Sequence, residues 1–255
     1  MLLSRFISSI KERDWGSIVV ELVIVVVGVF FGIQAANWNA NRLEQEQGRL
    51  ITERLLVDLR KDLVRRQTLT TYYQAVFDSA ERTVTRLNAE SVQNPSAFVV
   101  DAYRASEYAH LPATRATYDE IVSTGSFGLI PEAARQAGFA DYFRDKYSSS
   151  ARDAIRASPY RYRVRRLLPY DIQVAIKTKC GDMFNEYREV IGFDTNCNLE
   201  VSASQLNEAV EVLRSDLDLL RDLRFHISIL NAKTMVFGGE VRILEASIEA
   251  IDKAN

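Results

Sequence analysis

Residues 16–36 read GSIVVELVIVVVGVFFGIQAA, a run whose single ionisable side chain is Glu21. Trp15 and Trp38 stand on either side of this run. A helix over residues 15–38 would rise about 34 Å at 1.5 Å per residue, which matches the thickness of a bilayer core with its interfaces. Tryptophan is enriched at both headgroup levels, so we expect Trp15 and Trp38 to be interfacial anchors in contact with membrane lipids. The run therefore predicts a transmembrane helix over residues 15–38.

Two other interpretations of this run are a buried core helix and a cleaved signal peptide. A core helix of this length normally keeps a polar stripe, and the run has none. A signal peptide has a shorter apolar stretch that ends in small residues at a cleavage site. The sequence QAANWNANR, residues 34–42, offers alanines without a clean A-x-A spacing. The residues favour an uncleaved anchor.

The orientation of the span rests on weaker signals. Basic residues are almost equally frequent on its two sides, with Arg5, Lys11 and Arg13 before it and Arg42, Arg49 and Arg54 after it. The short stretch of residues 1–14 is typical of a signal anchor with a cytoplasmic N-terminus. We therefore expect a single-pass protein of the bacterial inner membrane, with residues 1–14 in the cytoplasm and residues 39–255 forming a periplasmic helical domain.

The two cysteines of the chain, Cys180 and Cys197, lie close together in the sequence. An even pair in an oxidising compartment is consistent with a disulfide, and a disulfide fits a periplasmic domain. The alternative is two unrelated buried thiols in a cytosolic domain. We expect the disulfide.

The composition predicts one folded, all-α domain beyond the span. About 215 residues follow Trp38, which is enough for a substantial core. The formal net charge of −2 gives no whole-chain reason to expect nucleic-acid binding. Glycine and proline are scarce, at 11 and 5 residues, and long periodic stretches indicate helices.

A long helix over about residues 40–88 continues from the span. Its apolar positions alternate in steps of three and four, as in a coiled coil: Leu56, Leu59, Leu63, Arg66, Thr70, Tyr73, Phe77, Ala80, Val84 and Leu87. Arg66 and Thr70 interrupt this seam. They indicate either a polar layer or a ligand-facing gap, or else a solvated edge.

A second long helix is predicted over about residues 203–253. Ser202 and Gln205 form a capping box at its start. Its first seam comprises Leu206, Val210, Leu213, Leu217 and Leu220. After a slip of three residues, which is a stammer, a second seam follows: Leu223, Ile227, Leu230, Thr234, Phe237, Val241, Leu244, Ile248 and Ile251. Gly238 and Gly239 could kink or split this helix. Two long seams predict an antiparallel bundle, coiled-coil-like, that returns the C-terminus towards the membrane.

Shorter helices are predicted between the two long ones. One helix starts with Asn94 as its cap and Pro95 as its first residue. The next is capped by Thr117 with Glu120 and ends at Gly125. A third starts at Pro131 and runs past Tyr147.

Two stretches resemble an uncharacterised bacterial family of single-pass membrane proteins, a domain of unknown function. The first is ELVIVVVGVFFGIQAANWN, Glu21 to Asn39, with a Glu in the span and Q-x-x-N-W-N at its exit. The second is YDEIVSTGSFGLI, Tyr118 to Ile130, which is similar to an L-x-x-S-G-x-x-x-L-I pattern with Ile121 in place of Leu. FADYF, residues 139–143, stands where the family has a tyrosine pair. The resemblance implies an architecture and no activity.

Catalytic and metal-binding motifs are not apparent in the sequence. His110 and His226 are far apart and lack Cys, Asp or Glu at ligand spacing, so we expect no metal and no cofactor. Nucleophile-elbow, Walker and dinucleotide-binding patterns are missing. STGSFG, residues 123–128, has two glycines but no phosphate-loop lysine, and we interpret it as a helix-ending turn. We expect the protein not to be an enzyme.

Glu21 is a candidate site residue because a carboxyl group inside a span is costly. On a helix it shares a face with Gly28, Gly32 and Ala36, and Gly28 and Gly32 form a G-x-x-x-G pair that permits close helix approach. The favoured interpretation is helix association through a hydrogen bond from Glu21. The alternatives are that Glu21 extends to the cytoplasmic headgroups, or that it couples to protons or ions.

A second candidate is a basic segment interleaved with tyrosines. It comprises Arg152, Arg156, Arg161, Arg163, Arg165 and Arg166. Such a cluster suits anionic groups. The other interpretation is a solvated surface whose charge is balanced by acids elsewhere in the fold.

The function most consistent with these features is that of a structural or accessory membrane protein. It would assemble through its span and bundle as a homo-oligomer or as a subunit of a larger membrane complex. The alternatives are a periplasmic ligand-sensing module that signals through a partner, an envelope hydrolase, and, more remotely, a proton- or ion-coupling subunit that uses Glu21. The short N-terminal stretch leaves no room for an output domain, which weighs against a sensor.

Overall fold

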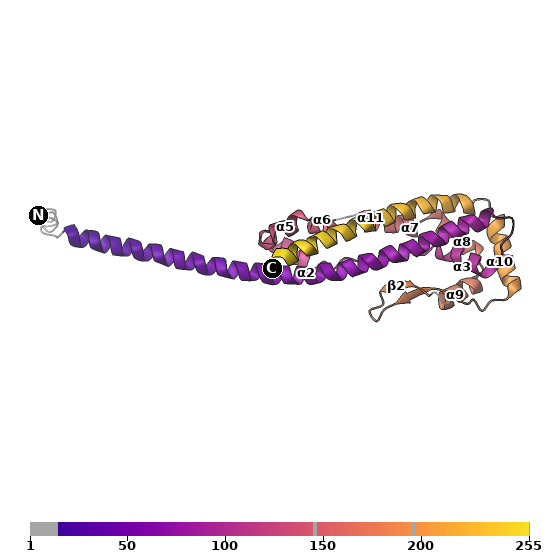
Figure 1. Cartoon of the computed structure of the whole chain (residues 1–255), viewed down its shortest axis with the longest axis horizontal. Helices are drawn as coiled ribbons and strands as arrows, with labels where there is room; N and C mark the ends of the chain where they lie inside the picture. The colour runs from indigo at the N-terminus through magenta and orange to yellow at the C-terminus, as the bar shows by residue number, and fades with distance from the viewer. Residues whose placement is uncertain (1–14, 145–146, 195–196, 255) are drawn as a thin grey trace, which may run out of the picture.

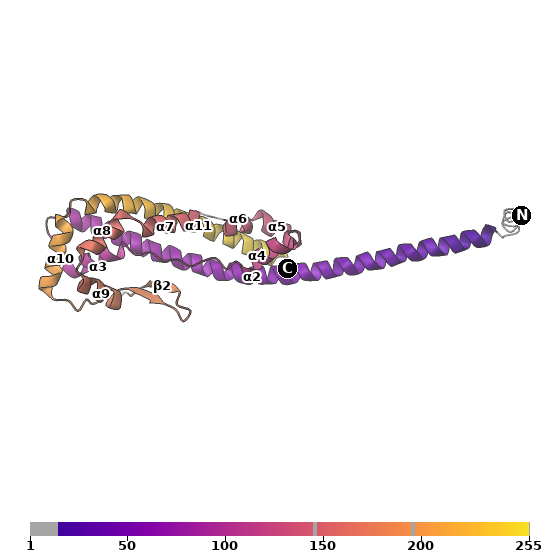
Figure 2. The same ribbon diagram turned by 180° about the vertical axis from the view of Figure 1, so that it is seen from behind.

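A computed structural model describes residues 15–144, 147–194 and 197–254 of the chain. The expected cytoplasmic stretch, residues 1–14, lies outside the described residues. The fold is all-α, as predicted, apart from a short hairpin. Figure 1 shows a long helix that leaves a bundle at one end, and Figure 2 shows the same arrangement from behind.

Two long helices form the axis of the bundle. Helix α2 (Trp15–Asn88) contains 74 residues and rises about 110 Å. Helix α11 (Leu219–Ala254) lies antiparallel to the second half of α2 (Figure 1). Near its end, Asp252 Oδ1 accepts a hydrogen bond from Arg60 Nη2 at 2.8 Å. The predicted antiparallel pair is therefore confirmed, and the C-terminus lies where α2 leaves the bundle.

Shorter elements cover the two long helices. In chain order they are α3 (Pro95–Arg104), α4 (Ala116–Thr124), η1 (Ser126–Leu129), α5 (Glu132–Gln136), α6 (Phe139–Arg144), α7 (Tyr147–Arg156), α8 (Pro159–Leu167), α9 (Tyr170–Lys179), β1 (Asp182–Phe184), β2 (Val190–Phe193) and α10 (Ala203–Ser215). Helices α3 and α4, η1 and the hairpin contact α2, whereas α5, α6, α7 and α8 contact α11. The core thus lies between the long pair and this outer layer.

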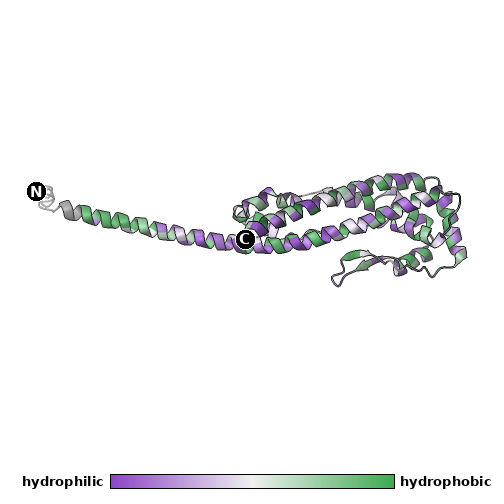
Figure 3. Cartoon of the chain, in the orientation of Figure 1, coloured by the Kyte–Doolittle hydropathy of each residue, from purple (hydrophilic) through white to green (hydrophobic). Residues whose placement is uncertain are grey.

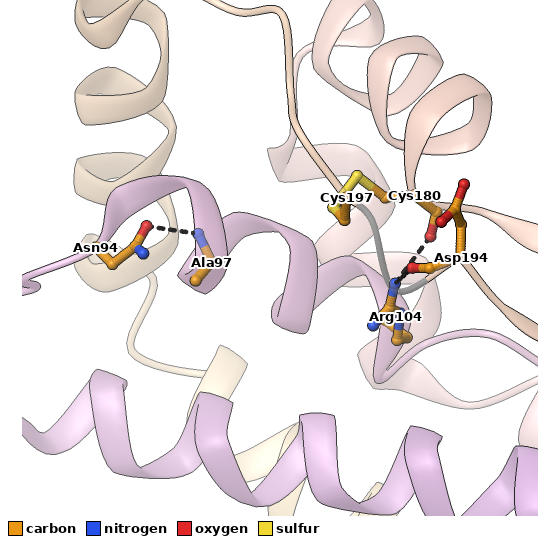
Figure 4. The surroundings of a disulfide bond; sticks show 6 residues. All are labelled: Asn94, Ala97, Arg104, Cys180, Asp194 and Cys197. Carbon is orange, nitrogen blue, oxygen red and sulfur yellow. Dashed lines mark hydrogen bonds between the residues drawn. A yellow bond between two sulfur atoms is a disulfide. The ribbon is translucent and has the colours of Figure 1, made fainter.

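Three of the predicted helix boundaries are confirmed. The Asn94 side chain accepts a hydrogen bond from the Ala97 N–H at 3.0 Å, and Pro95 is the first residue of α3 (Figure 4). Ser202 and Gln205 form the expected capping box of α10. Gly125 ends α4 with φ of 70°, a left-handed conformation that glycine adopts without strain.

The prediction of a cap at Thr117 is wrong. Helix α4 begins at Ala116, with Arg115 at the capping position, and Thr117 is buried inside the helix. The prediction of one helix from Pro131 past Tyr147 is also wrong. Gly138, with φ of 90°, separates α5 from α6, because a left-handed residue ends the helical hydrogen-bond pattern.

The C-terminal segment is broken at Asp216 and is continuous through Gly238 and Gly239. Asp216 Oδ1 accepts hydrogen bonds from the backbone N–H groups of Asp218 and Leu219, at 3.0 and 2.8 Å. Asp216 therefore caps α11. The predicted slip in the seam is a break between α10 and α11, because an aspartate competes well for the free N–H groups of a new helix.

The hairpin of β1 and β2 was not predicted from the sequence. It is antiparallel, with Asp182 opposite Phe193, and its strands are too short to give a clear alternating pattern. The Phe193 ring stacks on Tyr72 of α2, with ring centroids 4.5 Å apart. The Tyr72 hydroxyl donates to Asp182 Oδ1 at 2.9 Å. These two contacts hold the hairpin against the long helix.

A disulfide between Cys180 and Cys197 closes the base of the hairpin (Figure 4). Arg104 of α3 lies beside it and donates from Nη2 to the carbonyl oxygens of Cys180 and Asp194, at 3.0 and 3.3 Å. The Arg104 guanidinium carbon is also 4.6 Å from the centroid of the Phe193 ring. One arginine thereby ties both ends of the hairpin segment to α3.

The core seam of the long helices keeps the predicted alternation of three and four, but every second position is displaced by one residue, with the predicted Leu56 also buried beside Leu55. The buried positions of α2 include Thr52, Leu55, Leu59, Asp62, Arg66, Leu69, Tyr73, Val76, Ala80 and Thr83. Those of α11 are Leu219, Leu223, His226, Leu230, Lys233, Phe237, Glu240, Leu244, Ser247 and Ile251. The predicted residues Leu63 and Ile248 are partly buried against the core. A second layer of helices packs against the pair from one side and shifts the centre of the buried face.

This displacement places charged groups in the middle of the bundle. Arg66 Nε lies 2.9 Å from Glu240 Oε2, and both side chains are 5% exposed. Arg66 Nη1 donates to the carbonyl oxygen of Leu111 at 2.7 Å. The predicted polar layer at Arg66 is therefore present, and its partner is an acid on α11.

Asp62 extends the same layer one turn below Arg66. Its carboxylate accepts hydrogen bonds from the Thr114 N–H and hydroxyl, at 2.9 and 2.7 Å, and from the Tyr142 hydroxyl at 2.9 Å. Tyr142 belongs to the FADYF segment in α6. We call Asp62, Arg66, Tyr142 and Glu240 the polar layer. It separates two apolar clusters, one around Leu55, Leu59 and α4–α6, the other around Tyr73 and α3, α8 and α10.

We expect Glu240→Leu to destabilise the full-length protein in detergent by about 3–5 kcal/mol, because Arg66 would keep a buried charge without its acid. The double variant Arg66→Met with Glu240→Leu should recover most of that loss. Urea unfolding of both variants measures the difference. A double variant no more stable than Glu240→Leu alone would contradict this account of the layer.

Candidate functional site

The first part of α2 has the properties of a membrane span. Within the described residues, α2 contains the one segment that is long and apolar enough to cross a membrane, near the N-terminus. Figure 3 shows this apolar stretch extending away from the bundle. Every described side chain from Val19 to Trp38 is exposed. The described residues of the chain therefore provide nothing that covers this segment.

The predicted helix-packing residues lie on this exposed segment. Beyond the backbone of its own helix, a Cβ built on Gly28 or Gly32 would meet no atom of the described residues within 4 Å. Packing within one chain therefore gives no reason for glycine at these positions. Glu21 and Ala36 are exposed on the same helix. The face they share has room for a second helix.

The two tryptophans differ in how far the structure describes them. Trp38 is exposed, and the Arg42 guanidinium carbon lies 5.9 Å from the centroid of its ring. Trp15 is the first residue of α2, and its side chain lies outside the described part. An aromatic ring beside an arginine suits the headgroup level of a bilayer.

The six arginines of the basic segment differ in their partners. Arg163 lies between Asp216 and Asp222, with Nε 2.6 Å from Asp222 Oδ2. Arg152 pairs with Asp153 at 2.9 Å. The side chains of Arg156 and Arg166 are exposed. Arg152 and Arg163 are therefore paired with acids of the fold, which agrees with the interpretation of charge balanced by acids for these two residues.

Arg161 and Arg165 form a compact group with Glu107. Arg165 Nη2 lies 2.8 Å and Arg161 Nη1 lies 3.6 Å from the Glu107 carboxylate. Their guanidinium carbons lie 4.1 and 4.7 Å from the ring centroids of Tyr103 and Tyr108. Burial, with the neighbouring Arg165 charge, lowers the pKa of Arg161. The group joins α3 to α8, and its charges are already satisfied within the fold.

His226 is a core residue of α11. Its Nδ1 lies 2.8 Å from the Ser158 hydroxyl, and its Nε2 lies 2.9 Å from the carbonyl oxygen of Ala105. Since a carbonyl only accepts, Nε2 carries the hydrogen and Nδ1 accepts from Ser158. Burial lowers the pKa of His226 to about 4. Within the described residues, no group of three or more His, Cys, Asp or Glu could hold a metal ion.

The STGSFG segment forms the expected helix-ending turn and also contacts α2. A Cβ built on Gly48 would lie 3.1 Å from the Leu129 carbonyl oxygen. Glycine at position 48 therefore allows η1 to approach the long helix closely. This contact lies near the point where α2 leaves the bundle. The turn has a packing role in the fold.

The buried acids and the buried lysine at the centre of the bundle were not predicted from the sequence. Asp62, Lys233 and Glu240 are buried, and Lys233 Nζ lies 4.2 Å from the centroid of the Phe237 ring. A signal was present, since these residues recur at the spacing of the seam itself. The expected core positions were the neighbouring Leu63, Thr234 and Val241 instead, because a charge is normally costly in a core.

We expect Asp182→Asn to make the protein about 1 kcal/mol more stable at pH 7, allowing for the partial exposure of Asp182. Burial and, to a smaller extent, the charge of Glu107 raise the pKa of Asp182 to about 6. The folded state therefore holds this proton more tightly than the unfolded chain, whose Asp pKa is about 4. The contribution of Asp182 to stability is then lost as the pH rises between these two values. The asparagine keeps an acceptor for Tyr72.

The test is denaturant unfolding of both proteins across this pH range. The contribution of His226 to stability depends on pH in the opposite direction. Because its pKa is lowered in the folded state, this contribution is lost as the pH falls from about 6.5 to about 4. Because both proteins contain His226, its contribution cancels in the difference between their free energies of unfolding. A difference that stays constant with pH would contradict the role of Asp182.

Comparison with known proteins gives this chain no relatives. No protein-family model, no curated protein and no solved structure matches it. The family resemblance of residues 21–39 and 118–130 therefore stays an interpretation of the sequence.

Proposed function

We propose that this chain is a membrane-anchored structural or accessory protein. It assembles through its span and its helical bundle, either with copies of itself or with a larger complex of the bacterial inner membrane. The observation that carries the proposal is the continuity of α2, which runs from the apolar segment into the bundle core as one helix. Any helix that packs on the span is thereby coupled to the position of the bundle.

The composition of the span supports assembly. Glu21 is exposed in a segment where a carboxyl group needs a partner or a wet interface. Gly28 and Gly32 leave a shallow face beside it that no other part of the described chain fills. Small residues with a polar group are the combination by which helices associate in lipid.

The disulfide supports a periplasmic position for the bundle. Cys180 and Cys197 are bonded, and such bonds persist in oxidising compartments such as the bacterial periplasm. In this topology the span holds the bundle against the outer surface of the inner membrane. About six helical turns of α2, from Gly16 to Asn37, lie in the bilayer.

We expect Gly28→Leu combined with Gly32→Leu to reduce oligomer size and the recovery of co-purifying partners in mild detergent. Leucine adds bulk where close helix approach is needed. The matched control is Val26→Leu with Phe30→Leu, which has the same spacing on the opposite face of the span. Equal assembly in both double variants would argue against a packing face at the glycines.

We expect Glu21→Gln to keep assembly and Glu21→Leu to weaken it by about 1 kcal/mol. An amide still donates and accepts an interhelical hydrogen bond, whereas leucine does neither. The readout is the detergent-resistant oligomer fraction as a function of protein concentration. If both variants lose function completely with assembly intact, Glu21 serves proton coupling, since neither side chain titrates.

A further inference from the structure

The outer surface of α2 carries a regular apolar stripe that the bundle does not use. Over residues 39–88, all of them described, the large apolar side chains of α2 that are exposed are Leu43, Leu50, Val57 and Val64, at 57, 46, 66 and 62% exposure. Successive members are seven residues apart. We call these four residues the outer stripe.

The outer stripe lies opposite the core seam. At about 100° per residue, positions seven apart stay on one face and drift by only about 20° per heptad. Leu55 and Leu59, two residues before and after Val57, lie about 160° round the helix from it, and both are buried. The inner face of α2 therefore binds α11, and the stripe faces away from the bundle.

The same face continues into the membrane span. Ala36 lies one heptad before Leu43. By the same angular count, Glu21, Gly28 and Gly32 project within about 30° of the mean direction of the stripe. Because α2 is one helix, the proposed packing face of the span and the outer stripe form a single line along it.

We propose that the outer stripe is the contact surface for a second copy of this chain, parallel and in register with the first. This inference rests on the proposed function, since the span must first bring the copies together. Two copies anchored by the same span in one bilayer have the same direction and depth, so residues of the same number meet. Confinement to the membrane raises their effective concentration.

The charges beside the stripe fit a like partner. Arg49 pairs with Glu46 at 2.7 Å on its own helix. Arg54 pairs with Glu120 at 2.8 Å, and Arg60 with Asp252 at 2.8 Å. These three arginines are neutralised within each chain, which limits the repulsion between two identical surfaces, and Lys61 is a further exposed cation near the stripe. A soluble coiled coil has two apolar core positions per heptad, whereas the outer stripe has one. The contact therefore depends on the membrane span to hold the two copies together.

Cysteine cross-linking of the full-length protein in native membranes tests this surface. The variants are Leu43→Cys, Leu50→Cys, Val57→Cys and Val64→Cys, one at a time. The native cysteines are bonded to each other, so the introduced thiol is free to react. Controls are Gln45→Cys and Gln74→Cys, which are exposed on α2 away from the stripe. We expect a disulfide-linked dimer at the stripe positions and its loss at the controls.

A second variant tests the contact by introducing charge on the outer stripe. Leu50→Glu with Val57→Glu, in the Leu43→Cys background, should abolish the cross-linked dimer, since it sets like charges opposite each other. Val122→Glu, an exposed apolar position on α4, is the control and should leave the dimer intact.

The opposite outcomes separate this proposal from the proposed function. Equal cross-linking at Gln45 and Leu43, or a dimer absent from all stripe positions, overturns the second copy as the occupant. A cross-link from the stripe to a different protein overturns it as well. In each case the Gly28 and Gly32 variants still report whether the span assembles. Loss of oligomers in those variants, without a stripe dimer, would leave the proposed function standing alone.

Discussion

The ion pair between Arg66 of α2 and Glu240 of α11 fixes how the two long helices of this protein align. Both charges are buried, so either one left without the other would carry a large desolvation cost. A shift of α11 by one heptad would place Lys233 or Ser247 opposite Arg66. The first brings two cations together and the second removes the acid. A seam of apolar residues alone would tolerate such a shift much better.

The rest of the bundle is arranged around this alignment. Asp62 draws in Thr114 and Tyr142, which positions the segment before α4 and helix α6 against α2. The carbonyl oxygen of Leu111 accepts from Arg66 and holds the chain between α3 and α4. His226, two turns above Lys233 in the same seam, links α3 to the start of α8 through Ala105 and Ser158. Polar residues of the seam thus determine where the short helices lie, while the apolar clusters on either side supply the burial.

The inner and outer faces of the long helix α2 make different contacts. Its inner face carries the seam with α11, and Tyr72 holds the disulfide-closed hairpin through Phe193 and Asp182. Its outer face has glycines in the span and one apolar residue per heptad beyond it. Because α2 has no break between its apolar segment and the bundle, contacts made on either part act on one continuous helix. This is the physical basis of the assembly role that we propose.

Local chemistry in the sequence determined the apolar helical segment at the start of α2, the long helices, several caps and the pairing of Cys180 with Cys197. An apolar run, a capping box at Ser202 and a glycine at position 125 each act over a few residues, so their effects can be read without the fold. The tertiary structure alone decided which of two adjacent seams is buried. Leu63 is more apolar than Asp62 and Val241 more apolar than Glu240, so the sequence favoured the wrong member of each pair. The charged residues are buried because Arg66, Thr114 and Tyr142 come from distant segments to satisfy them, and no local pattern contains that information.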